Sequence, residues 1–119
     1  MAQSLYERLG GTEGITRIAS DVVDNHVANP KVGKRFANSD VPSLKQHAAD
    51  FFITGSGGPQ VYNGKTMLDA HRGMNISDEE FMAVVDNVMD ALAKNEIGEA
   101  ERAEVLYIFY QLRPEVVRV

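Results

Sequence analysis

The sequence predicts a single all-α domain that spans residues 1–119. Apolar side chains recur with a period near 3.6 in four long stretches, and no stretch alternates apolar and polar residues as a strand does. Glycines, prolines and helix-capping side chains separate these stretches. Because 44% of the 119 residues are apolar, the chain is long enough to form one hydrophobic core.

The first long helix is expected to begin after Gly10-Gly11, with Thr12 as its cap. Pro30 disfavours a helical conformation at the residue before it, so the helix should end ahead of that proline. A short helical piece ending at Phe36 should follow. The core face of the long helix is predicted to carry Ile15, Ile18, Ala19, Val22, His26 and Val27.

The second long helix should begin at Val41-Pro42, because proline suits the first helical turn and Asp40 precedes it as a capping residue. Its apolar positions follow the i, i+3, i+4, i+7, i+8 pattern and are Leu44, His47, Ala48, Phe51 and Phe52. The glycine-rich stretch 55–64 then predicts a long loop.

Two further long helices are expected in the second half of the chain, after a short helix from Thr66 to Arg72. Ser77 and Glu80 have the spacing of a capping box, which predicts a long helix from Ser77 onward. The last helix should start near Glu99 and end at Arg113, because Pro114 follows.

Histidines are the informative residues for chemistry. The chain has no cysteine, which excludes cysteine nucleophiles, thiolate zinc sites and iron–sulfur clusters. His47 and His71 each lie on the apolar face of a predicted helix, so both should point inward. They are either structural histidines bonded to neighbours or ligands of one shared group. His26, near the end of its helix, is expected at the surface or at the edge of the core.

A porphyrin iron suits two inward histidines best. A zinc site made by protein alone needs three or four ligands, and neither His47 nor His71 follows a glutamate by three residues, as di-iron bundles require. Haem asks for only one or two axial imidazoles and an apolar slot. Candidate lining residues, which ordinary core packing would explain equally, are Phe36, Phe51, Phe52, Tyr62, Met67, Ile76, Phe81, Val85 and Phe109.

The charged residues give weaker indications. Lys45 and Arg72 flank the two candidate ligand helices and would suit haem propionates, although solvated helix faces look the same. A net charge of −5 without a basic run argues against nucleic acid as a partner. The sequence shows no signal peptide and no membrane span, so we expect a cytoplasmic protein.

The chain resembles the truncated haemoglobins, in particular group I. The resemblance rests on the order of SLYERLGG, GGPQVYNG, MLDAH and NIS-DEEF and covers nearly all 119 residues. It implies a two-over-two helical sandwich around non-covalent haem b, with His71 as the proximal ligand. It further implies that Phe36 packs on the haem face and that Leu44, Ala48 and Phe51 form the distal wall.

Two departures from the family pattern affect ligand binding. Val23 occupies the position where many members have a tyrosine that bonds bound oxygen. Loss of such a bond speeds oxygen release by roughly tenfold or more, unless Gln46 or His47 supplies a replacement. His47 stands where some members have a second iron ligand, so we expect a partly bis-histidyl resting state. No histidine follows His71, which argues against covalent attachment of the haem.

The resemblance implies reversible binding of oxygen, nitric oxide or carbon monoxide by a monomer. Nitric oxide dioxygenation with a reductase is one activity that it suggests, and electron transfer or redox sensing suits a bis-histidyl iron equally. The alternative is a cofactor-free helical interaction module in which all three histidines are structural.

Overall fold

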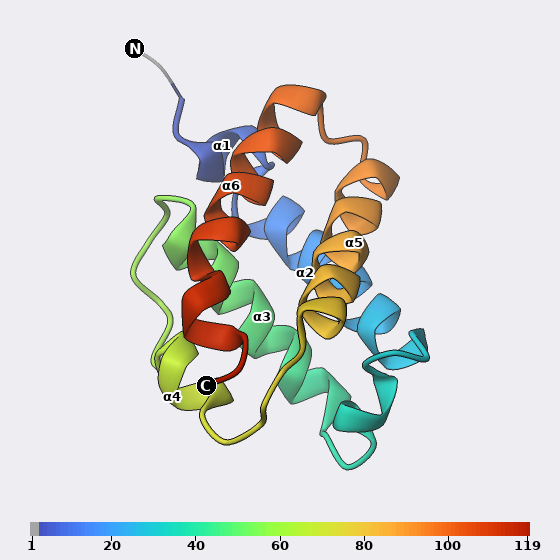
Figure 1. Cartoon of the computed structure of the whole chain (residues 1–119). Helices are drawn as coiled ribbons and strands as arrows, with labels where there is room; N and C mark the ends of the chain where they lie inside the picture. The colour runs from blue at the N-terminus through green and yellow to red at the C-terminus, as the bar shows by residue number, and fades with distance from the viewer. Residues whose placement is uncertain (1–2) are drawn as a thin grey trace.

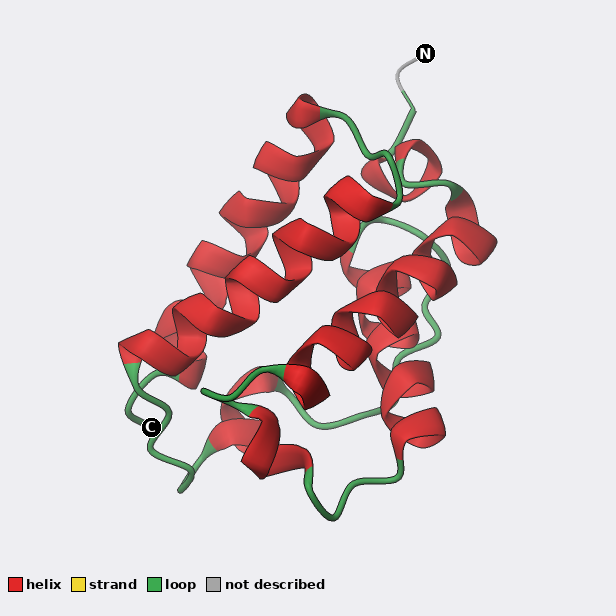
Figure 2. Ribbon diagram, turned by 90° about the vertical axis from the view of Figure 1, so that its right-hand side faces the viewer, coloured by secondary structure: helices red, strands yellow, loops and turns green. Residues whose placement is uncertain are grey.

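A computed structural model describes residues 3–119, and every regular segment in that range is helical (Figures 1 and 2). The predicted all-α fold is therefore confirmed. The only strand-like feature among the described residues is a parallel bridge between Ile76 and Val117. In chain order the helices are α1 (Leu5–Arg8), α2 (Gly11–Ala28), the 3₁₀ helix η1 (Gly33–Phe36), α3 (Val41–Gly55), α4 (Met67–His71), α5 (Asp78–Lys94) and α6 (Glu99–Val116).

The four long helices form two layers. Helix α2 packs along α3, helix α5 packs on both α2 and α6, and the short α4 lies against α6. Figure 1 shows the α5–α6 pair in front of the α2–α3 pair. The core between the layers is apolar, and its most deeply buried large side chains are Ile15, Val22, Val23, Val88 and Leu92. No helix within residues 3–119 combines the length and the apolar character needed to cross a bilayer.

Side-chain caps fix the starts of α5 and α4, and the cap of α5 is the predicted Ser77–Glu80 capping box. The Ser77 hydroxyl accepts a hydrogen bond from the Glu80 backbone N–H, and the Glu80 carboxylate accepts one from the Ser77 N–H, each at 3.1 Å. The Thr66 hydroxyl likewise accepts from the backbone N–H of Asp69 at 3.1 Å. These bonds satisfy amides that have no partner within the helix, and they fix where α5 and α4 begin.

The start of α2 differs from the prediction. Gly10, with a φ of +101°, occupies the capping position, and Thr12 lies inside the helix. The hydroxyl oxygen of Tyr6 accepts the Thr12 backbone N–H at 3.1 Å, so a residue from the preceding turn satisfies this amide. Tyr6 lies in α1, a short helix that the sequence pattern did not predict.

The end of α6 also differs from the prediction, because the helix passes Pro114 and reaches Val116. Proline costs the helix one hydrogen bond, but burial of Val116 beside Ile76, Phe81 and Val85 offsets that loss. After α6, residues 117–119 run beside residues 73–76. Arg118 N–H donates to the Ile76 carbonyl at 2.9 Å, and Gly73 N–H donates to the Val119 carbonyl at 3.1 Å.

Candidate functional site

Helix α4 presents His71 at its last position. The ring nitrogen Nδ1 lies 2.7 Å from the carbonyl oxygen of Met67. A carbonyl only accepts, so Nδ1 carries the proton and Nε2 keeps its lone pair. The half-buried imidazole is thereby oriented to use Nε2 as a ligand atom.

All three histidines of the chain line one cavity between α2, α3, α4, α5 and α6, which we call the histidine cavity. His26 enters it from α2, His47 from α3 and His71 from α4. Apart from these three and Tyr62, its wall is apolar and consists of Val22, Val23, Leu44, Ala48, Phe51, Phe52, Met67, Val88, Phe109 and Leu112. His47 and His71 thus line the same cavity.

His47 is more exposed than its predicted inward orientation implied. Ala49 and Ile53 form the fully buried side of α3, and they face the core with α2. The stripe that contains His47 instead faces the cavity, and the imidazole lies at its exposed rim.

A second hollow adjoins the histidine cavity on the side of η1 and α5. The two share Met67, His71, Phe109 and Leu112. The remaining lining of the adjoining cavity comprises Val32, Arg35, Phe36, Met74, Ile76, Glu80, Phe81, Val84 and Val116. His71 therefore stands where the two hollows meet.

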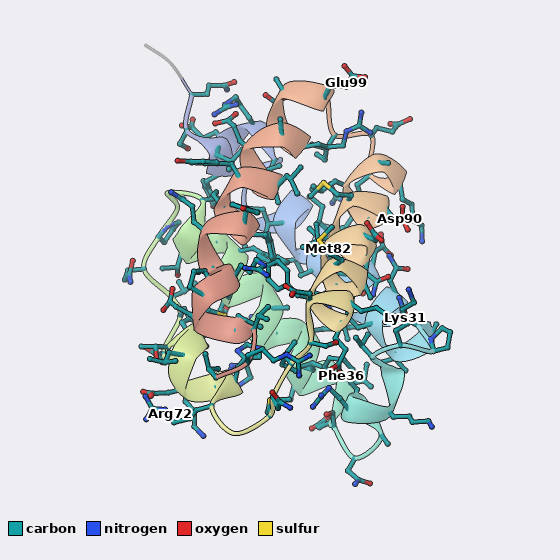
Figure 3. All side chains as sticks on the ribbon, in the orientation of Figure 1. Lys31, Phe36, Arg72, Met82, Asp90 and Glu99 are labelled. Atoms are coloured by element: carbon teal, nitrogen blue, oxygen red, sulfur yellow. The ribbon has the colours of Figure 1, made fainter. Side chains whose placement is uncertain are left out.

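Most of the predicted pocket residues line one of these two hollows, but three do not. Lys45 pairs with Asp24 at 2.9 Å between Nζ and the carboxylate. Arg72 projects away from the molecule beside α4 (Figure 3), and its guanidinium lies 3.6 Å from the carboxylate of Asp69. Val85 is buried in the core next to Phe81.

Arg35 is the basic side chain that the structure places in the wall of the adjoining cavity. Its guanidinium bonds both carboxylate oxygens of Glu80, and this pairing holds the pKa of Glu80 down at about 2. Sequence periodicity did not find Arg35, because η1 is too short to show a pattern. It did not find that His26 faces the cavity either, although a position at the edge of the core was expected.

The glycine-rich loop is anchored to the cavity through Tyr62. The Tyr62 ring packs on Phe51 at 5.4 Å between centroids, and its hydroxyl donates to the Lys65 carbonyl at 2.7 Å. Gly64 permits this approach, since a Cβ there would lie 2.4 Å from the Tyr62 oxygen. The loop thus closes one side of the histidine cavity.

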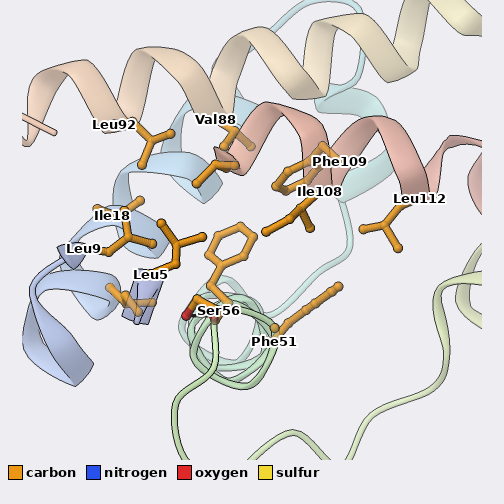
Figure 4. Close-up of a pocket in the computed structure, with 14 residues that line it drawn as sticks. Leu5, Leu9, Ile18, Phe51, Ser56, Val88, Leu92, Ile108, Phe109 and Leu112 are labelled. Carbon is orange, nitrogen blue, oxygen red and sulfur yellow. Dashed lines mark hydrogen bonds between the residues drawn. The ribbon is translucent and has the colours of Figure 1, made fainter. Parts of the chain in front are cut away.

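A separate apolar cavity lies nearer α1, between α2, α3, α5 and α6 (Figure 4). It shares with the histidine cavity the side chains of Phe51, Phe52, Val88, Phe109 and Leu112. These shared residues border both spaces, and the lining of the second cavity is almost wholly apolar.

Comparison with known proteins identifies the family. The model of the bacterial-like globins matches residues 4–117 of the chain. The chain belongs to the bacterial-like globin family. The resemblance to group I truncated haemoglobins is thereby confirmed, and the chain is a haem-binding globin.

The similar proteins cover the whole domain. A group 1 truncated hemoglobin of Tetrahymena pyriformis is 28% identical over 115 residues, which are 97% of this chain and 95% of that protein. The crystal structure of its Fe(III) form superposes with a TM-score of 0.94 over 98% of this chain and all of that one. The 2/2 hemoglobin of Synechococcus, solved in the cyanomet state with covalently attached heme, is 28% identical with a TM-score of 0.90, over 97% of this globin and 98% of that chain.

The residues present in this globin fit a haem. His71 offers Nε2 from a fixed ring, and Phe36, Met67, Phe81, Phe109 and Leu112 provide the apolar faces that a macrocycle needs. Within residues 3–119 no three His, Asp or Glu side chains gather as a metal site. His47 and His71 each bring an imidazole to the histidine cavity, from α3 and from α4.

Proposed function

We propose that this globin holds non-covalent haem b through His71 and reversibly binds oxygen, nitric oxide or carbon monoxide on the side of His47. The observation that carries the proposal is that His47 and His71 approach one cavity from different helices, with His71 oriented by Met67. Haem, when bound, supplies an iron that takes up diatomic gases and changes oxidation state.

His47 is proposed as a reversible second ligand of the resting state. Its place at the exposed rim of α3 allows the imidazole to move toward or away from the centre of the cavity. When His47 occupies the ligand position, an external gas binds only to the fraction of molecules in which the imidazole has left, and apparent affinity falls by that fraction.

Absorption spectra test this axial assignment directly. The ferric protein should show a low-spin spectrum, and His47→Ala should convert it to a high-spin spectrum while the Soret band remains. Leu44→Ala, one turn earlier on the same face, is the matched control and should leave the protein low-spin. An unchanged spectrum in His47→Ala would refute the second-ligand role. Absence of any Soret band after addition of haem would refute the whole proposal and favour an interaction module with structural histidines.

The reaction that we propose for this globin is nitric oxide dioxygenation. We propose that the protein acts as a monomer. Nitric oxide, oxygen and one electron from a reductase then give nitrate. The bis-histidyl state favours electron transfer as the second candidate, because ligation by two imidazoles changes little between oxidation states. Sustained consumption of nitric oxide with stoichiometric nitrate, in the presence of oxygen and a ferredoxin–reductase pair, supports dioxygenation. If nitric oxide is consumed only once while the protein continues to be reduced and reoxidised, the result supports electron transfer.

A further inference from the structure

His26 is a half-buried polar group in an otherwise apolar part of the histidine cavity. It lies on α2 one turn after Val22 and Val23, which also line the cavity. Its ring stacks on Phe36, with centroids 5.7 Å apart and planes 13° from parallel. The position of the imidazole is thus set by packing, and it is neither free nor at the outer surface.

A relay of amide groups fixes the proton on this imidazole. The backbone N–H of Lys31 donates to Asn29 Oδ1 at 2.8 Å, which leaves Asn29 Nδ2 to donate to Asn87 Oδ1 at 3.2 Å. Asn87 Nδ2, 2.9 Å from His26 Nδ1, is therefore a donor as well. Since a backbone N–H can only donate, the direction of every bond follows, and Nδ1 of His26 must accept.

The neutral ring consequently carries its proton on Nε2. Burial lowers the pKa of His26 to about 4, so the ring is neutral at physiological pH. Asn87 is itself buried, and its backbone carbonyl accepts from Asn25 Nδ2 at 3.1 Å. Hydrogen bonds thus hold both amides of the relay in place, Asn29 in the turn between α2 and η1 and Asn87 on α5.

Nε2 of His26 has no hydrogen-bond partner within residues 3–119. Over the same residues, every side-chain nitrogen or oxygen that is fully buried has a hydrogen-bond partner. Because Nε2 has none, it is not fully buried. The cavity that His26 lines is the histidine cavity. Two other polar groups of that wall are already engaged, since Tyr62 donates to Lys65 and His71 Nδ1 to Met67.

We propose that His26 donates its Nε2–H to the diatomic ligand in the histidine cavity and so favours oxygen over carbon monoxide. This inference rests on the proposed gas binding. Oxygen carries partial negative charge when it binds haem and accepts a hydrogen bond well, whereas carbon monoxide accepts one poorly. His26 would thus provide the bond that Val23, an apolar residue, cannot make.

The test compares oxygen and carbon monoxide dissociation in a His47→Ala background, where His47 cannot bond or compete with the ligand. His26→Leu should raise the oxygen dissociation rate about tenfold or more, with less than about threefold change for carbon monoxide. His26→Gln places an N–H near the position of Nε2 and should restore most of the slow oxygen release. The carbon monoxide stretching frequency should rise in His26→Leu and return in His26→Gln.

A measurement without haem checks the same inference independently. Nitrogen-15 NMR of the apoprotein near pH 7 should show His26 protonated on Nε2 only. A proton on Nδ1 would overturn the proposal, as would an unchanged oxygen rate in His26→Leu or equal changes for both gases. Failure of the parent protein to bind haem or gas would instead overturn the proposed function. The NMR result would still report the tautomer of His26, because it is measured without haem.

Discussion

The Nδ1 atom of His71 lies 2.7 Å from the carbonyl oxygen of Met67, one helical turn earlier. This bond keeps the imidazole in the tautomer that presents Nε2 as a ligand, and it ties the ligand to the backbone of α4. The strength of haem retention should therefore depend both on the imidazole and on the short helix that holds it.

Removing the imidazole should abolish or greatly weaken haem retention. His71→Ala takes away the nitrogen that α4 positions, whereas His47→Ala removes only the ligand at the rim. Titration of each apoprotein with haem, followed at the Soret band, measures the difference. Equal retention of haem by the two variants would contradict the proximal role of His71.

Weakening the cap of α4 should loosen haem without removing any ligand. Thr66→Ala deletes the acceptor for Asp69 N–H, and a lost helix cap costs about 1 kcal/mol. Haem should then transfer roughly fivefold faster to an excess of apomyoglobin. Thr66→Ser keeps the hydroxyl and is expected to behave as the parent, so faster transfer from Thr66→Ser as well would argue against the cap.

A tyrosine at position 23 should slow oxygen release. Val23 is buried and lines the histidine cavity, so Val23→Tyr brings a hydroxyl to the ligand and adds a bond that reduces the dissociation rate about tenfold. Val23→Phe adds nearly the same volume without the hydroxyl. Stopped-flow oxygen release should be slow only in Val23→Tyr, and slowing in both variants would indicate a steric effect.

Neutralising Glu80 should make the free energy of unfolding less dependent on pH in the acid range. The bond from Arg35 lowers the Glu80 pKa from its ordinary 4.5 to about 2. A carboxylate with a depressed folded pKa contributes stability above pH 4.5, and that contribution disappears as the pH falls toward 2. After screening at this partly exposed pair, the contribution is about 1–2 kcal/mol.

Urea unfolding of Glu80→Gln between pH 2 and 6 checks this expectation, and it should show a shallower loss of stability than the parent. Glu79→Gln is the matched control, because the Glu79 carboxylate is largely exposed and lies 3.3 Å from Lys31. The Arg35 assignment would be refuted if Glu80→Gln kept the parental slope.

Sequence patterns located the long helices because caps and prolines act through neighbouring residues. Ser77 and Glu80 lie in one turn, and the short helix that carries His71 starts directly after Thr66, where its start was expected. The end of α6 could not be predicted in this way. Val116 continues the helix past Pro114 because it packs on Ile76 and Phe81, which are far away in sequence.

The same distinction applies to the site. Periodicity assigned His47 and His71 to faces that do line one cavity. His26 obtains its partner from Asn87, 61 positions later, so a local pattern could place it near the core edge but could not reveal its hydrogen bond. The partner of Lys45 likewise lies on another helix, because its ion pair is with Asp24 on α2. A local pattern on α3 could not reveal it.

The pairing of residues 118 and 119 with the segment that follows His71 has a consequence for the timing of folding. Gly73 and Ile76 receive their backbone partners from Val119 and Arg118. During synthesis, His71 therefore leaves the ribosome well before the segment behind it can be completed. We expect haem capture in its final geometry to await the synthesis of residues 118 and 119, and nascent chains stalled before residue 116 to hold haem weakly.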